Sequence, residues 1–151
     1  METDPHARSI VTMRDQLETH FKARQDVYVA GSMALYYRRG DSQAVVVPDV
    51  FAVLRAAQQE ARKSYLLSEE GGVAPSFVVE VASPSTSRRD ATSKRAMYER
   101  MGVHEYWRFD PLGKLTAGRL AATSGCGLCE RLAGTGARPV TDSPCAPAAD
   151  R

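Results

Sequence analysis

The chain places a glutamate in the middle of an apolar run. Glu80 lies within residues 77–82, FVVEVA, and burying a carboxylate there is costly unless it is paired or bound to a metal. Strict alternation puts Val78, Glu80 and Ala82 on one face of a strand, and that face is mostly apolar. In the alternative, the strand has one solvated face and Glu80 points to water. Periodicity alone supports the two interpretations about equally.

A lysine falls on the apolar face of the helix expected over residues 87–101. Five residues share that face because they fall at positions i, i+4, i+7, i+8 and i+11: Asp90, Lys94, Met97, Tyr98 and Met101. A solvent-exposed Asp90–Lys94 pair is the alternative and would contribute only a few tenths of a kcal/mol. The spacing favours an inward lysine that shares a pocket with Glu80.

Asp49 supplies a second carboxylate, because it follows an apolar strand and Pro48 and can project at a strand bend. Taken alone, Asp49 is better interpreted as a turn or capping residue. Two carboxylates are suitable ligands for Mg²⁺, which activates water and offsets charge on a phosphate. A nearby lysine can position the nucleophile or stabilise the transition state. Asp49, Glu80 and Lys94 together therefore predict a phosphodiester-hydrolysis site.

The elements expected to position these residues alternate between helix and strand. An amphipathic helix is predicted over residues 5–24, after an Asp4-Pro5 start. Val-rich and Tyr-rich runs predict strands at 26–30, 33–37, 44–47, 50–54, 77–82 and 104–111. A tight turn is expected at Gly31-Ser32, and residues 56–76 are polar, with a turn at 69–72. This order predicts an α/β domain.

Composition is that of one soluble domain, with 151 residues, 43% of them hydrophobic, and a net charge of +2. The polar start and the absence of a long apolar run predict a cytoplasmic protein without a membrane segment. Residues 113–151 are rich in glycine and are expected to be poorly ordered. Cys126 and Cys129 have the spacing of half a zinc site, but only Cys145 follows them, so the three are better interpreted as free thiols.

The order of these motifs resembles the Uma-two family, classed as endonucleases of the restriction-endonuclease-like PD-(D/E)XK superfamily. The similarity covers roughly residues 10–112, and Ala82 stands where the family pattern has Leu. The matching motifs are Pro48-Asp49, the segment 80–86 (EVASPST), Asp90 with Lys94, Tyr98, Gly102-Val103, the segment 105–107 (EYW) and Asp110-Pro111.

The resemblance implies a restriction-endonuclease-like mixed sheet flanked by helices, in a nuclease domain over residues 1–112. It also implies that Mg²⁺ or Mn²⁺ is bound by Asp49, Glu80 and the Val81 carbonyl. The superfamily lysine lies two residues after the acid, where this chain has Ala82, so Lys94 would take its role. Asp90 would cap the helix or orient Lys94, and the upstream helix offers Asp15 and Glu18 as further acids.

The resulting hypothesis is a metal-dependent endonuclease that acts on nucleic acid, with DNA as the expected partner. Phosphate contacts are expected from arginines near the site in sequence: Arg38, Arg39, Arg88, Arg89 and Arg95. One alternative is a catalytically inactive nucleic-acid-binding or protein-interaction module on the same fold. Another is a truncated product that does not fold stably. A homodimer is left open.

Overall fold

A six-stranded mixed sheet forms the centre of the protein. The computed structural model describes residues 4–56, 62–83, 88–113, 120–124 and 130–132. The strand order is β1-β4-β6-β7-β8-β9. These strands are β1 (Val27–Gly31), β4 (Val50–Leu54), β6 (Phe77–Val81), β7 (Glu105–Phe109), β8 (Leu120–Ser124) and β9 (Glu130–Leu132).

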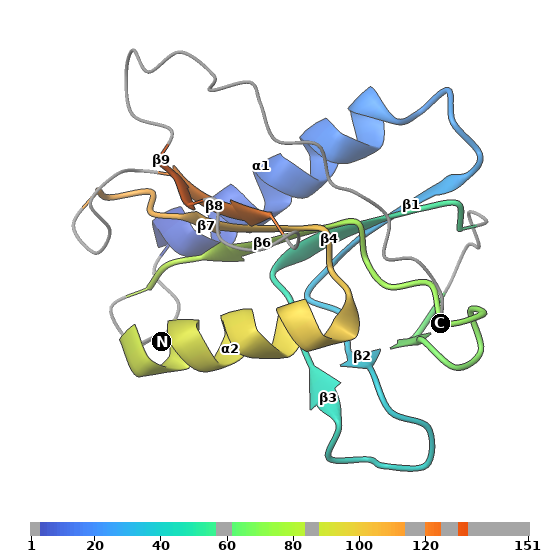
Figure 1. Ribbon diagram of the computed structural model, residues 1–151. Coiled ribbons are helices and arrows are strands. Elements are labelled where there is room, and N and C mark those ends of the chain that lie inside the picture. The colour runs from blue at the N-terminus through green and yellow to red at the C-terminus, as the bar shows by residue number, and fades with distance from the viewer. Residues whose placement is uncertain (1–3, 57–61, 84–87, 114–119, 125–129, 133–151) are drawn as a thin grey trace, which may run out of the picture.

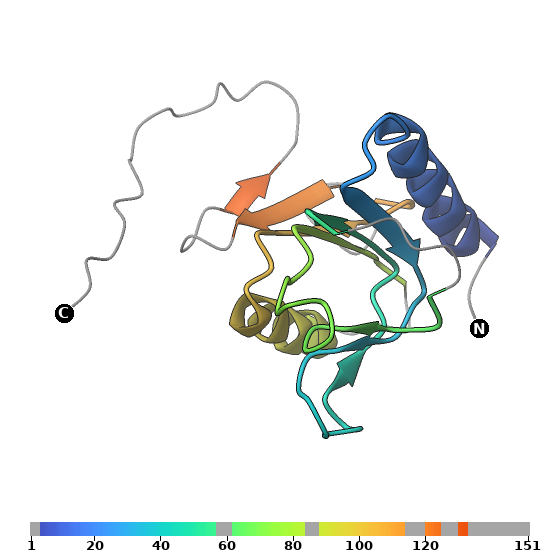
Figure 2. The same ribbon diagram turned by 90° about the vertical axis from the view of Figure 1, so that its right-hand side faces the viewer.

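Two helices cover opposite faces of this sheet. Helix α1 (Asp4–His20) lies on one side and helix α2 (Arg88–Met101) on the other (Figures 1 and 2). The central strands β4 and β6 are buried on both faces, and apart from Glu80 their residues are apolar. Helix α2 connects β6 to the parallel strand β7, so the chain forms a β-α-β crossover at the centre of the sheet. The predicted α/β class and the sheet flanked by helices are confirmed.

The core on the α2 side is completed by a second, three-stranded sheet. Its order is β3-β2-β5, from β3 (Val45–Val46), β2 (Leu35–Tyr36) and β5 (Tyr65–Leu66). Tyr28, Phe51 and Tyr65 meet between the two sheets, with ring centroids 5.9–6.3 Å apart. Tyr98 of α2 belongs to the same core and is fully buried. This packing fixes α2 against the face of β6 that carries Glu80.

The sequence predictions for the two helices and for β1, β4, β6 and β7 are confirmed to within a few residues. Gly102 ends α2 with a positive φ of 83°, which glycine adopts at low cost. The expected strand at 33–37 shrinks to β2. Gly31-Ser32 does not join β1 to a paired neighbour, because β1 pairs with β4. Strand β5 lies in the region read only as polar.

The end of the chain contributes two strands to the large sheet. Strand β8 pairs with β7, and β9 pairs with β8, both antiparallel. Both strands fall within residues 113–151, the segment expected to be poorly ordered. Cys126, Cys129 and Cys145 lie outside the described residues. In the part of the chain that the structure describes, neither helix has the length and apolar character needed to cross a bilayer.

Candidate active site

The register of the central strands brings Asp49 beside Glu80. Strands β4 and β6 pair antiparallel, with Val50 opposite Val79. The ladder ends at this pair, so Asp49 directly precedes the paired part of β4 and Glu80 directly follows Val79 on β6. Pro48 has no N–H to offer a ladder, and the Asp49 side chain continues the pairing instead. Its Oδ2 accepts a hydrogen bond of 2.7 Å from the Val81 N–H.

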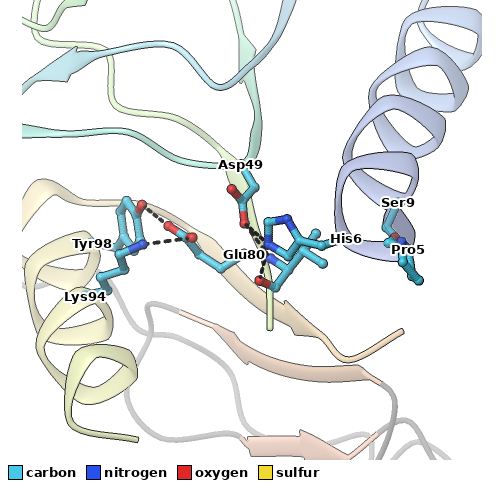
Figure 3. A network of polar contacts seen from close by, with 8 residues as sticks. Pro5, His6, Ser9, Asp49, Glu80, Lys94 and Tyr98 are labelled. Atoms are coloured by element: carbon cyan, nitrogen blue, oxygen red, sulfur yellow. Dashed lines mark hydrogen bonds and ion pairs between the residues drawn. The ribbon is translucent and has the colours of Figure 1, made fainter. Parts of the chain in front are cut away.

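Glu80 is buried, so the interpretation that it points to water is wrong. The residue is 7% exposed, and both of its carboxylate oxygens are hydrogen-bonded by α2. Lys94 Nζ lies 3.0 Å from Oε2, and the Tyr98 hydroxyl donates to Oε1 at 2.6 Å (Figure 3). The inward stripe predicted for α2 is therefore confirmed at Lys94 and Tyr98. The Lys94 side chain remains 25% exposed, so it lies at the edge of the buried region.

The electrostatics of Glu80 combine opposing influences. Burial raises the pKa of its carboxyl group most strongly, because desolvation disfavours the charged form. The Lys94 charge and the Tyr98 hydrogen bond lower the pKa, whereas the Asp49 charge raises it, and the net direction is upward. Burial and the Glu80 charge likewise raise the pKa of Tyr98, so its hydroxyl stays protonated and donates. Glu80 is thus a carboxylate that would gain from a nearby cation.

Removing the Tyr98 hydroxyl should destabilise the protein through Glu80. In Tyr98→Phe the buried carboxylate loses one of its two donors, and a hydrogen bond to a charged group contributes about 1.5–3 kcal/mol. We expect a loss of that size in the free energy of unfolding, measured by urea denaturation at pH 7.5. Tyr28→Phe is the control, since the hydroxyl of this core tyrosine donates to the uncharged Met33 Sδ, at 3.4 Å. Equal losses in the two variants would show that the Glu80 bond adds nothing.

A second group of polar atoms lies on the other side of the β6 backbone. His6, at the start of α1, places Nε2 3.0 Å from the Val81 carbonyl oxygen and 3.9 Å from Asp49 Oδ2 (Figure 3). Its side chain is 8% exposed, whereas that of Asp49 is 19% exposed. The Val81 carbonyl, which the resemblance implies as a metal ligand, therefore already has an imidazole neighbour.

Sequence reasoning missed His6, although a signal was present. Ile10, Met13 and Leu17 mark the inward stripe of α1, and His6 begins the same stripe at i, i+4, i+7 and i+11. This is the pattern that singled out Lys94 on α2. A histidine at the buried end of an amphipathic helix, opposite the strands that carry two acids, indicates a site residue.

The other predicted residues fall in different places. Asp15 and Glu18 are exposed on α1, where both pair with Arg14. Asp90 lies on α2, but its side chain is outside the described residues, as are those of Arg88 and Arg89. Arg38 and Arg39 are exposed in the loop between β2 and β3, beside a pocket of about 570 Å³, and Arg38 pairs with Asp41.

The chemistry of the donors fits a divalent cation. The Val81 carbonyl and the Glu80 carboxylate belong to adjacent residues, and the Asp49 carboxylate is hydrogen-bonded to the Val81 N–H. Oxygen donors of these kinds bind Mg²⁺ and Mn²⁺. A cation near Glu80 would also offset the burial that chiefly raises the pKa of its carboxyl group, and the smaller contribution of the Asp49 charge. In the described ranges no three His, Cys, Asp or Glu side chains gather as a metal cluster, since Glu80 is turned toward α2.

Comparison with known proteins identifies a shared fold and a family. The chain is similar to the crystal structure of a "putative nuclease belonging to DUF820" from Anabaena variabilis, with a TM-score of 0.67 and 15% identity. The match covers 93% of this chain and 74% of the other, and shows a shared restriction-endonuclease-like fold. No curated protein matches the chain. The model of the Uma2 family, described as "Putative restriction endonuclease", matches residues 1–117. The chain therefore belongs to the Uma2 family.

Proposed function

We propose that this protein is a metal-dependent endonuclease that hydrolyses phosphodiester bonds in nucleic acid. Asp49 and Glu80 hold a divalent cation, Mg²⁺ or Mn²⁺, together with the Val81 carbonyl, and Lys94 positions the attacking water. The observation that carries the proposal is the 3.0 Å contact between Lys94 Nζ and Glu80 Oε2. A lysine from the helix that follows β6 reaches the acid, although the position two residues after that acid is Ala82.

Each residue has a role that follows from its contacts. Tyr98 and Lys94 fix the orientation of the Glu80 carboxylate through one oxygen each. The Val81 N–H holds the Asp49 carboxylate at the end of the paired strands. Lys94 is exposed enough to hold water and to offset negative charge on a phosphate. A bound divalent cation would supply acidification of water and further charge compensation at the scissile phosphate.

The proposed substrate is nucleic acid, and DNA in particular. Restriction-endonuclease is the description of the family model, and phosphate contacts require basic side chains near the site. Arg38 and Arg39 offer exposed guanidinium groups on the α2 side of the sheet, and Arg95 offers a partly buried one on α2 itself. Contacts to phosphate do not depend on the base sequence. We therefore propose that these arginines contribute to binding but not to sequence specificity.

Asp49→Asn is the substitution that tests the nuclease proposal most directly. The amide oxygen can still accept the Val81 N–H, so strand pairing is kept while the negative charge is lost. We expect supercoiled and linear DNA to be cut by the wild type with Mg²⁺ or Mn²⁺, and at a rate at least about 100-fold lower by the variant. Asp15→Asn, on the exposed face of α1, serves as the matched control.

Equal cleavage by Asp49→Asn and wild type would remove Asp49 from the site. Absence of cleavage by the wild type, on DNA and on RNA and with either ion, would contradict the nuclease proposal as a whole.

A non-catalytic nucleic-acid-binding module is the second candidate. It is favoured by the full engagement of Glu80 with Lys94 and Tyr98, which leaves no three-residue metal cluster within the described part of the chain. Titration calorimetry separates the two candidates. A module would take up neither Mg²⁺ nor Mn²⁺, and would bind DNA with an affinity that falls with salt and without cleavage.

A further inference from the structure

His6 lies where a ligand from α1 would enter the proposed metal site. Its Nε2 faces the Val81 carbonyl oxygen and one oxygen of the Asp49 carboxylate, and the proposed function assigns both of these groups to the cation. We infer that His6 is a nitrogen ligand of this site, and that the site therefore prefers Mn²⁺ or another first-row transition ion to Mg²⁺. The inference rests on the proposed function, because it concerns the same site, but it makes a separate prediction about metal choice.

The distances support a shared ion. Two ligands at about 2.1 Å from one octahedral ion lie about 3 Å apart when adjacent and about 4.2 Å apart when opposite. His6 Nε2 and the Val81 oxygen are 3.0 Å apart, which matches an adjacent pair. His6 Nε2 and Asp49 Oδ2 are 3.9 Å apart, between the two values. Both distances from His6 Nε2 are therefore compatible with ligands of one cation.

The identity of the donor decides which cation is preferred. Mg²⁺ favours oxygen ligands and retains its waters, whereas imidazole nitrogen suits first-row transition ions. With only Asp49, Glu80 and the Val81 carbonyl, the site would be an all-oxygen site suited to Mg²⁺. A buried imidazole in the set shifts the preference toward Mn²⁺, and more strongly toward Co²⁺, along the usual order of affinities.

His6 has an alternative role as a structural residue that only donates a hydrogen bond to the Val81 carbonyl. The variant His6→Gln separates the roles, because its amide N–H can still donate to that carbonyl. An amide nitrogen has no lone pair available for a transition ion. If His6 is a ligand, the glutamine variant loses Mn²⁺ affinity. If His6 is only a hydrogen-bond donor, the variant retains it.

The experiment is titration calorimetry with MnCl₂ and MgCl₂ on the full chain, for wild type, His6→Gln and His20→Gln. His20 is an exposed histidine at the opposite end of the same helix and provides the matched control. We expect the Mn²⁺ affinity to fall by about 10–100-fold in His6→Gln, with little change for Mg²⁺ and no change in the control. Unchanged Mn²⁺ affinity, or equal losses for both ions, would overturn the inference.

A spectroscopic measurement on the wild type keeps the inference testable if the glutamine variant does not fold. Electron spin echoes of bound Mn²⁺ should show ¹⁴N modulation from a directly bound imidazole, and its absence would overturn the inference. The two proposals also fail separately. Nitrogen-coupled Mn²⁺ without any cleavage would leave the ligand in place and remove the nuclease. Cleavage by the wild type, with Mn²⁺ binding lost in Asp49→Asn but kept in His6→Gln, would remove His6 as a ligand and leave the nuclease proposal in place.

Discussion

Replacing Lys94 with methionine is expected to lower the rate of DNA cleavage by about 10²–10³-fold. Methionine keeps much of the length and apolar contact of the lysine stem but removes the ammonium that contacts Glu80 Oε2 at 3.0 Å. Among the described residues, Lys94 is the only basic residue with an ion pair to the Glu80 carboxylate. Its loss removes both the group that holds water and the charge that faces the phosphate. Single-turnover cleavage at saturating Mn²⁺ measures the effect on the chemical step.

A second substitution tests whether position 94 has taken over a role from position 82. Ala82 directly follows β6, and its N–H still donates to the Phe109 carbonyl at 2.7 Å. If the alternation of side chains along the strand continues to this residue, positions 80 and 82 project to the same face. A lysine introduced as Ala82→Lys would start from the Glu80 side of the strand. The double variant Ala82→Lys/Lys94→Met should therefore recover at least about tenfold of the lost rate. Ala82 is buried, so a thermal melt must first show that the double variant folds.

Lys63→Met is the matched control for these variants, since Lys63 is exposed in the connection between β4 and β5. Cleavage by Lys94→Met at the wild-type rate would remove the lysine from the mechanism. A loss in Lys94→Met that tracks a fall in Mn²⁺ affinity, and disappears at saturating ion, would assign Lys94 to holding Glu80 and not to the reaction.

Local patterns predicted the parts of the site that each lie within one element. Helical spacing placed Lys94 and Tyr98 on the inward face of α2, and the apolar run around Glu80 marked a central strand. Both are confirmed by the contacts of Glu80. Alternation could not decide whether Glu80 was buried, because that depends on α2 covering its face of the sheet. This covering of the sheet is a tertiary contact, in which Tyr98 of α2 packs into the core.

Features that depend on pairing between distant strands were harder to predict. The site residue His6 meets Val81 across 75 positions of sequence, and only the packing of α1 on β6 brings them together. The Gly31-Ser32 turn suggested a local hairpin, but Ser32 N–H bonds to the carbonyls of Pro48 and Asp49 instead. Short strands such as β5 have two residues each, which is too few for a periodic signal.

Replacing Glu80 with glutamine is expected to abolish metal-dependent cleavage and, at neutral pH, to stabilise the fold. The amide is isosteric and can still accept the Tyr98 hydroxyl, but it carries no charge to desolvate. Lys94 loses its anionic partner, and because 25% of that side chain is exposed, water can solvate the ammonium. We therefore expect a higher melting temperature for Glu80→Gln at pH 8, together with a cleavage rate at least about 100-fold lower.

The pH dependence of this difference follows from the raised pKa of Glu80. The ordinary carboxyl pKa is 4.5, and burial raises it in the folded protein. Between these two values the folded state binds more protons than the unfolded chain, so the contribution of Glu80 to the free energy of unfolding falls as pH rises. Below pH 4.5 both states are protonated and the cost is absent. Above the raised pKa the cost is complete. The advantage of Glu80→Gln should be small at pH 4 and grow to a plateau.

Urea denaturation of both proteins from pH 4 to pH 8 measures this curve, with Glu18→Gln as the control for an exposed carboxylate. Addition of Mn²⁺ at pH 8 should then stabilise the wild type and leave Glu80→Gln unchanged, because only the carboxylate form binds the ion. A variant less stable than wild type by the same amount at every pH would show that the hydrogen bonds of Glu80 outweigh its desolvation. A carboxylate that destabilises its own fold, and is relieved by a cation, is held in place for binding that cation, because a purely structural role would favour glutamine.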